Sequence, residues 1–204
     1  MKRIVVAITG ATGAIYGVRL LEALRQAPEA ESHLVISRWG RENIELETGF
    51  TVSQVEALAD YCYGPDDLAA PLASGSFRRA AMVVVPCSMK TLAAIAQGQA
   101  ADLVSRAADV ALKEQTKLIL AVRETPLNAI HLENMLKLAR LGAVIMPPMP
   151  SYYHQPKSLG DLERQFTGRL LDQLDVDHQF CRRWGEAGQS GQSDQSGQSG
   201  QSGQ

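Results

Sequence analysis

The residues with the clearest chemical potential form a glycine turn near the amino terminus, residues 9–14 with the sequence TGATGA. The turn lies between an apolar run, residues 4–8, and an amphipathic segment, residues 15–24. When a strand enters a helix through such a turn, backbone N–H groups converge and the helix dipole favours a bound phosphate. The two glycines permit close approach, and the two threonines offer hydroxyl donors. The turn therefore predicts a phosphate-bearing ligand without saying which one.

Three classes of phosphate-bearing ligand use turns of this kind, and the flanking residues separate them. A P-loop requires GxxxxGK followed by Ser or Thr, and no lysine follows these glycines. A dinucleotide site uses GxGxxG and an acidic residue about 20 residues further on. Gly10, Gly13 and Gly17 come close to that spacing without matching it, and the second predicted strand ends at Ser37 rather than at an acid. Arg38 could serve a 2′-phosphate, so NADP stays open, but a mononucleotide such as FMN fits Ser37 better.

A second string has the spacing of the catalytic Tyr-x-x-x-Lys of short-chain dehydrogenases, with Tyr153 and Lys157. That chemistry requires both side chains on one face of a helix, so that the ammonium lowers the pKa of the tyrosine. Pro156 removes a backbone donor from this stretch and pushes Gln155 out of helical geometry. We therefore interpret the string as unrelated to dehydrogenase chemistry.

The elements that must position these residues alternate between strand-like and helix-like segments. Short apolar runs predict strands at residues 4–9, 33–37, 80–85, 118–122 and 143–146. Helical patterns lie at residues 15–25, 41–48, 89–96, 103–113, 130–141 and 159–174, whereas residues 60–76 are irregular and rich in Pro, Gly and Ser. Continuous apolar strands separated by helices indicate a parallel sheet covered on both faces. The sequence thus predicts one α/β domain with a Rossmann-like, doubly wound parallel sheet.

In such a sheet, ligands bind beyond the carboxyl ends of the strands, and the predicted strands here end in polar or reactive residues. Ser88 follows the third strand and is equally well placed to cap the next helix. Cys87, beside it, is expected to be a small buried residue rather than a nucleophile. Arg123 and Glu124 follow the run 118–122 at the mouth of the sheet, where desolvation would perturb both groups. An ion pair that closes the strand end accounts for these two residues equally well.

Composition narrows the partners and the compartment. The 204 residues are 45% hydrophobic and 21% charged with a formal net charge of −2, which favours neither nucleic acid nor an anionic membrane surface. No apolar stretch approaches the ~20 residues that span a bilayer. Cys62, Cys87 and Cys181 are odd in number and widely spaced, which is typical of a reduced, cytoplasmic protein. From residue 185 the sequence is dominated by Gly, Gln and Ser repeats, which predict a disordered tail over residues 185–204.

Seven strings occur in register along the chain. In order they are TGATGA at 9–14, ASGS at 73–76, PCS at 86–88, SRAADV at 105–110 with KE at 113–114, RETP at 123–126, HL at 131–132 with Met135, and YYHQP at 152–156. Together they resemble the UbiX-like flavin prenyltransferases, a family formerly described as aromatic acid decarboxylases. The resemblance runs from Lys2 to Trp184, so it defines a single domain over residues 1–184. The related cysteine decarboxylases share the flavin-binding fold, but their Pro-x-Met-Asn-x-x-Met-Trp substrate clamp has no counterpart in this sequence.

The resemblance implies a transferase that joins the dimethylallyl group of dimethylallyl phosphate to N5 and C6 of reduced FMN. The product would be a prenylated FMN for a partner decarboxylase of the UbiD type. A cation-like allylic transition state needs a dry pocket, and the departing phosphate needs cationic and hydroxyl donors. Because the donor is a monophosphate, no metal ion is expected, and the sequence has no Asp-rich motif. The family forms homododecamers with sites at subunit junctions, which implies the same assembly here.

The resemblance also implies roles for individual residues. FMN would be held by residues at the strand ends, namely Gly10, Ala11, Thr12, Ser37, Ser88, Met89, Lys90, Thr91 and Arg123. The prenyl phosphate would be surrounded by Lys113, Glu124, Tyr153 and Arg169, with Arg106 reaching it from a neighbouring subunit. Proton transfer falls to Glu124, and the other catalytic candidates are Thr12, Glu47 and Lys113. Trp184 would place its π face near an allylic cation.

The turn and the fold leave alternatives open. Thr12 stands where the family turn usually has Ser, and its extra methyl group bears on the rate or on the preferred prenyl donor. A non-catalytic FMN-binding subunit, or a flavin-dependent decarboxylase of phenolic acids, would use the same fold. The second phosphate site, formed by Lys113, Glu124, Tyr153 and Arg169, favours the transferase, because a flavin carrier has no need of it.

Overall fold

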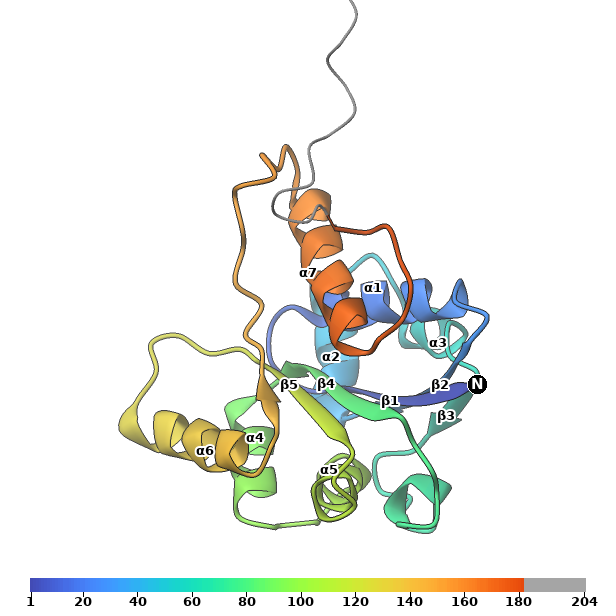
Figure 1. Cartoon of the computed structure of the whole chain (residues 1–204), viewed down its shortest axis with the longest axis vertical. Helices are drawn as coiled ribbons and strands as arrows, with labels where there is room; N and C mark the ends of the chain where they lie inside the picture. The colour runs from blue at the N-terminus through green and yellow to red at the C-terminus, as the bar shows by residue number, and fades with distance from the viewer. Residues whose placement is uncertain (182–204) are drawn as a thin grey trace, which may run out of the picture.

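Residues 1–181 are described by a computed structural model of the chain, in which six parallel strands form one sheet (Figure 1). The strand order is β3-β2-β1-β4-β5-β6, so the topology switches direction between β1 and β4. The strands are β1 (Lys2–Ile8), β2 (Ala30–Ile36), β3 (Tyr61–Tyr63), β4 (Ala81–Cys87), β5 (Lys117–Val122) and β6 (Val144–Ile145). The helices are α1 (Ala14–Arg25), α2 (Arg38–Glu47), α3 (Val52–Glu56), α4 (Met89–Ala96), α5 (Leu103–Lys113), α6 (Ala129–Arg140) and α7 (Leu159–Gln173), with a short 3₁₀ helix at Pro71–Ala73.

Different helices cover the two faces of the sheet (Figure 1). α1 and α7 pack on one face, and α4, α5 and α6 pack on the other. Alternate residues of β1 divide between the two layers, because Ile4, Val6 and Ile8 join the first cluster and Val5 and Ala7 join the second. All five side chains are fully buried. Burial on both faces explains why the strands appear in the sequence as unbroken apolar runs.

The α/β architecture predicted from the sequence is confirmed, but β3, α3 and the short 3₁₀ helix at Pro71–Ala73 escaped prediction. β3 lies inside the stretch predicted to be irregular, and α3 had no predicted counterpart. β3 has three residues and α3 has five, so neither is long enough to show a periodic pattern. No helix within residues 1–181 combines the length and the apolarity that crossing a membrane requires. The predicted tail, residues 185–204, lies outside the described residues.

Most helices begin at a side chain that accepts a hydrogen bond from the first helical turn, which satisfies one of its exposed N–H groups. The capping side chains are Ser37 (α2), Thr51 (α3), Ser88 (α4), Asp102 (α5), Asn128 (α6) and Ser158 (α7). α1 differs, because it begins at Gly13, which has a φ of 96° and no side chain to offer. Another part of the chain must therefore satisfy the amino end of α1.

A buried histidine makes the stability of this fold sensitive to acid. His33 in β2 is 3% exposed, with Nε2 2.9 Å from Glu31 Oε1 and Nδ1 3.0 Å from the Tyr63 hydroxyl. Burial lowers the pKa of His33, and the hydrogen bond to His33 lowers the pKa of Glu31. Both groups therefore bind protons less readily in the folded chain than in the unfolded chain, so the free energy of unfolding falls as the pH falls.

We expect the melting temperature to drop between about pH 7.5 and about pH 5.5, and to drop less in a His33→Gln variant. Scanning calorimetry of both proteins across this range measures the difference. Equal losses in the two proteins would show that His33 does not carry the effect.

Candidate functional site

Hydrogen bonds tie four strand ends together at the carboxyl edge of the sheet. The contacts are Ser37 N to Ile8 O at 3.0 Å, Thr9 N to Pro86 O at 3.3 Å, Ser88 N to Thr9 Oγ1 at 2.9 Å and Arg123 N to Cys87 O at 3.1 Å. They link β2 to β1, β1 to β4 and β4 to β5. The edge includes the switch in strand order between β1 and β4, where ligands of such sheets bind. The structure thus gathers the residues predicted to hold FMN on one edge.

Packing and backbone conformation explain why glycine occupies both positions of the turn. A Cβ on Gly10 would lie 2.3 Å from Cβ of Trp39, in the first turn of α2, so only glycine lets α2 pack against the turn. Gly13 has the positive φ that glycine adopts without strain. Asn43 of α2 also holds the turn, since its Nδ2 donates to Ala11 O at 3.0 Å. Close packing of α2, rather than ligand approach, accounts for Gly10.

Glu47 satisfies the amino end of α1. Its Oε2 accepts hydrogen bonds from Gly13 N at 2.7 Å and from Ala14 N at 3.2 Å. The expectation that these N–H groups point at a bound phosphate is therefore wrong for this conformation, because a carboxylate of α2 holds them. Thr9 also departs from expectation, since its buried hydroxyl donates to Pro86 O at 2.7 Å and so bridges two strands. Thr12 is exposed and remains a candidate ligand residue.

We expect Glu47→Gln to lower the free energy of unfolding by about 0.3–1 kcal/mol, because the amide oxygen still accepts a hydrogen bond but the favourable interaction of the negative charge with the helix dipole is lost. Urea unfolding followed by circular dichroism measures the change. Glu45→Gln is the matched control, since Glu45 is exposed on the same helix. If both variants lose the same stability, the cap on α1 contributes nothing specific.

Ser37 and Ser88 each cap a helix at this edge. Ser37 Oγ accepts from Gly40 N at 3.1 Å, and Ser88 Oγ accepts from Thr91 N at 3.3 Å. The interpretation of Ser88 as an N-cap is confirmed. Capping uses the oxygen as an acceptor, so the Ser37 hydroxyl keeps its hydrogen as a donor for an anion. Ser88 Oγ also lies 3.0 Å from Thr91 Oγ1, and its hydrogen is available to an anion when Thr91 is the donor of that pair.

Arg123 and Glu124 are exposed, in contrast to the expected desolvation at the mouth of the sheet. Glu124 Oε1 accepts a hydrogen bond from Thr125 N at 3.0 Å. The alternative of an ion pair between the two side chains is also wrong, because none forms between them in the described chain. The β5 end therefore presents a guanidinium and a carboxylate that none of the other residues within 1–181 shields from solvent.

Tyr153 and Arg169 line one cavity of about 240 Å³ beyond the end of β6. Tyr153 comes from the loop after β6 and Arg169 from α7. Much of the remaining wall is apolar, formed by Met146, Pro147, Met149, Leu162 and Phe166. Phe166 packs edge to face on Tyr16 of α1, with ring centroids 5.0 Å apart, so the cavity adjoins the helix that follows the glycine turn. The cavity combines an apolar wall with a phenol and a guanidinium.

Arg106 and Lys113 form a separate group on α5. Arg106 Nε donates to Ala73 O at 3.1 Å, and Lys113 forms an ion pair with Glu114 beside Gly75. The segment 73–76 and α5 thus lie side by side, and both belonged to the strings found in the sequence. Arg106, Lys113 and residues 73–76 therefore form a second cluster, separate from the residues at the carboxyl edge of the sheet.

Lys113 and Glu124 lie at opposite ends of β5. Lys113 ends α5 just before β5 begins, whereas Glu124 follows the end of β5. A strand of six residues spans about 20 Å. The expectation that Lys113 joins Glu124 around one phosphate therefore fails within a single chain.

Other sequence interpretations can be checked directly. Residues 147–157 contain no helix and Gln155 has a φ of 53°, so the rejection of a dehydrogenase-like Tyr153–Lys157 pair is confirmed. Cys87 is fully buried, and burial raises the pKa of its thiol to about 12, which suits a packing residue. Trp184 lies outside the described residues.

The structure adds two polar residues of α7 that the sequence analysis missed. Gln165 Nε2 donates to the Tyr153 hydroxyl at 2.6 Å, and Asp172 Oδ2 accepts from Arg169 Nη1 at 2.6 Å. Each contacts a predicted phosphate ligand. The only signal in the sequence is their spacing on the predicted helix, four residues before Arg169 and three after it, which many exposed helical residues share.

Comparisons of the sequence and of the fold with known proteins identify the family of this chain. The Flavoprotein family model matches residues 1–163. A probable UbiX-like flavin prenyltransferase from Streptomyces sp. (strain D7) is 56% identical over 182 residues, which cover 89% of this chain and 91% of the relative. The crystal structure of a dodecameric FMN-dependent UbiX-like decarboxylase from Escherichia coli O157:H7 is 52% identical with a TM-score of 0.88, over 89% of this chain and 98% of that one. The crystal structure of AnUbiX (PadA1) in complex with FMN and dimethylallyl pyrophosphate is 53% identical with a TM-score of 0.89, over 92% of this chain and 99% of that one. The chain belongs to the flavoprotein family, as a member of the UbiX-like flavin prenyltransferases.

Proposed function

We propose that this protein transfers a dimethylallyl group from dimethylallyl phosphate to reduced FMN and releases inorganic phosphate. The observation that carries the proposal is the cavity that pairs an apolar wall with Tyr153 and Arg169. A prenyl phosphate has the same two parts, a five-carbon apolar chain and an anionic head. The volume of about 240 Å³ lies below the ~300 Å³ at which drug-sized sites begin, which suits so small an ester.

FMN would occupy the neighbouring carboxyl edge. The residues there fit a mononucleotide: the hydroxyls of Thr12, Ser37 and Ser88 are donors, and the exposed Arg123 and Lys90 supply positive charge. Gly10, Ala11, Met89 and Thr91 complete the predicted contacts through the backbone and the first turn of α4. When bound, reduced FMN supplies the nucleophilic nitrogen of the reaction.

The roles of the chain's own residues follow from charge and position. Tyr153 and Arg169 would bind the phosphate and stabilise the negative charge that grows as the allylic C–O bond breaks. Glu124, an exposed carboxylate at the end of β5, would move a proton between the flavin and the departing phosphate. Thr12, with one methyl group more than serine, would border both substrates and limit the space for the donor. Glu47 would hold the turn that carries Thr12 by capping α1.

Arg106 and Lys113 would complete the phosphate site from neighbouring subunits. The separation of Lys113 from Glu124 by the length of β5 within one chain supports this assignment for Lys113, and the exposure of Arg123 and Glu124 leaves room for both residues. A homododecamer like the Escherichia coli relative would bring the two edges of different chains together. We assign no metal ion to the site, because two to three cationic side chains can neutralise a monophosphate.

The prenylated FMN would serve a partner decarboxylase of the UbiD type, and the reaction would take place in the cytoplasm, where thiols such as Cys62 and Cys87 stay reduced. The alternatives are a non-catalytic FMN-binding subunit and a flavin-dependent decarboxylase of phenolic acids. The cavity that pairs an apolar wall with Tyr153 and Arg169 favours the transferase over both.

An anaerobic assay with reduced FMN and dimethylallyl phosphate tests the proposal. We expect a flavin heavier by one five-carbon unit in the mass spectrum, together with free phosphate, and neither product when the donor is omitted. A parallel reaction with dimethylallyl diphosphate distinguishes the monophosphate from the diphosphate as donor. Unchanged flavin mass with both donors would overturn the proposal, and release of carbon dioxide from a phenolic acid by the FMN-loaded protein alone would favour the decarboxylase.

A further inference from the structure

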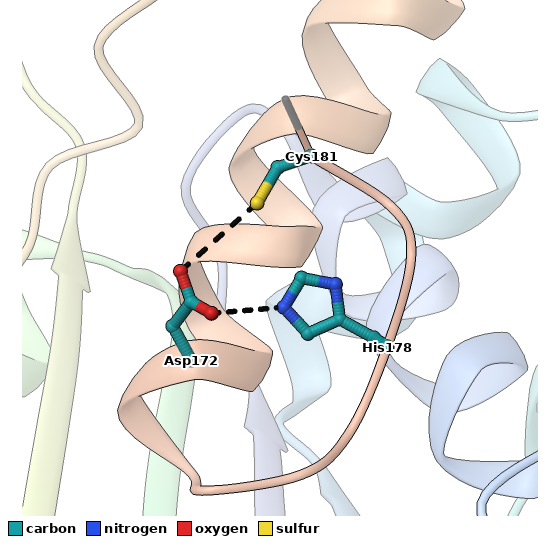
Figure 2. Close-up of side chains that lie close together, drawn as sticks. All are labelled: Asp172, His178 and Cys181. Atoms are coloured by element: carbon teal, nitrogen blue, oxygen red, sulfur yellow. Dashed lines mark hydrogen bonds and ion pairs between the residues drawn. The ribbon is translucent and has the colours of Figure 1, made fainter. Parts of the chain in front are cut away.

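A polar cluster joins α7 to the segment that follows it (Figure 2). Asp172 of α7 accepts a hydrogen bond from His178 Nε2 at 3.1 Å through Oδ1, and Cys181 Sγ lies 4.0 Å from its Oδ2. Arg169 Nη1 donates to the same Oδ2 at 2.6 Å. The side chains of Asp172 and His178 are 13% and 3% exposed, so both are largely shielded from solvent.

Carboxylate, imidazole and thiol groups within 4.8 Å of one another are also the donors of a metal site. Two contacts argue for hydrogen bonding instead. Phe180 N donates to His178 Nδ1 at 3.0 Å, so the neutral ring carries its proton on Nε2, the atom that faces Asp172. The guanidinium of Arg169 already contacts Asp172 Oδ2, and a metal ion there would face a second positive charge.

Packing on α7 makes the cluster rigid. A Cβ on Gly168 would lie 2.7 Å from Cβ of Cys181 and 3.0 Å from Cε1 of His178, so the returning segment crosses α7 where only glycine leaves room for it. His178 is therefore seated against α7, and its hydrogen bond fixes the carboxylate of Asp172. A fixed, mostly buried carboxylate holds an arginine better than an exposed one, because less side-chain freedom is lost and solvent screens the pair less.

The contact with Asp172 orients the side chain of Arg169. Its side chain is half exposed and lines the cavity described above. Gln165, one turn earlier on the same helix, donates a hydrogen bond to the Tyr153 hydroxyl, whereas Asp172 accepts one from Arg169. α7 thus carries one fixed partner for each of the two phosphate ligands.

We propose that Asp172, seated by His178, is a positioning residue that directs Arg169 toward the phosphate of the prenyl donor. This inference rests on the proposed function. It assigns roles to Asp172, His178 and Gly168, none of which contacts the reacting atoms. The carboxylate acts through the guanidinium, so its effect requires Arg169.

The test compares Asp172→Asn, Arg169→Gln and the double variant in the full chain loaded with FMN. We expect Asp172→Asn to raise the KM for dimethylallyl phosphate about tenfold while the Kd for FMN stays unchanged, and to have no further effect in the Arg169→Gln background. Arg164→Gln, which breaks an ion pair on the same helix with Asp161, is the matched control and should leave KM unchanged. Multiplying effects in the double variant would overturn the inference, since a merely structural role does not depend on Arg169.

His178 variants keep the inference testable if Asp172→Asn folds poorly, as its melting temperature will show. His178→Ala should raise KM severalfold, whereas His178→Gln, which retains a donor for Asp172, should restore it. A lower KM in Asp172→Asn would mean that the carboxylate competes with phosphate for Arg169, and would refute the positioning role. Failure of the proposed function has a different signature, because the wild-type protein would then neither bind dimethylallyl phosphate in calorimetry nor prenylate FMN.

Discussion

Glu124→Gln is expected to slow prenyl transfer by about 10²–10⁴-fold while leaving the Kd for FMN unchanged, the range typical of removing one general acid–base group. The amide is nearly isosteric with the carboxylate and still accepts the hydrogen bond from Thr125 N. Local geometry at the end of β5 should therefore survive. What is lost is the ability to take up and deliver a proton.

Single-turnover kinetics under anaerobic conditions, with mass analysis of the flavin, measure this effect, and fluorescence titration measures FMN binding. Glu133→Gln on α6 is the control, because Glu133 is an exposed carboxylate outside the site. Loss of FMN binding in Glu124→Gln would assign the residue to cofactor binding instead. An unchanged rate would remove it from the proton-transfer step.

Mixed oligomers should recover activity that neither parent has. Lys113→Gln and Glu124→Gln each remove one part of the site, so each protein alone should be nearly inactive. If Lys113 serves the Glu124 of another subunit, random co-assembly leaves roughly a quarter of the sites with both native residues, as independent sampling of two chains in a symmetric oligomer requires. The geometric reason is the length of β5, which separates the two residues by about 20 Å within one chain.

Co-expression with two affinity tags isolates the mixed oligomers, and the prenylation assay measures their activity. The control is a chain carrying both substitutions, co-assembled with the wild-type chain in the same ratio. It should reach the same quarter of native sites if the residues act between chains. Activity of about half in this control, with none in the first mixture, would place both residues in one chain.

The turn at residues 9–14 shows which structural features can be predicted from a local sequence pattern. An apolar run, two glycines and an amphipathic helix predicted a strand, a turn and a helix, and these are present as β1, Gly13 and α1. The same reasoning predicted the strand ends that meet at the carboxyl edge, including Ser37, Ser88 and Arg123. These predictions succeed because parallel strands share a direction, so residues that follow different strands must lie on one edge.

The partner of α1 could not be predicted in the same way. Glu47 lies 34 residues from Gly13, and nothing in its neighbourhood marks it as a helix cap. A carboxylate reaches those N–H groups only because α2 packs against the turn, with Trp39 beside Gly10. The same limit applies to Asp172, whose burial depends on His178 crossing α7 at Gly168.

The sequence by itself determined the α/β class, the parallel sheet, the family and the edge where the residues predicted to bind FMN gather, since all of these follow from periodicity and from matched strings. The tertiary structure decided which of those residues one chain can bring together. It placed Tyr153 and Arg169 in one cavity and put Lys113 at the opposite edge from Glu124. The physical reason is that a strand holds the residues at its two ends a fixed distance apart. The sequence position of a residue, in contrast, does not tell which subunit of an oligomer contributes that residue to a given site.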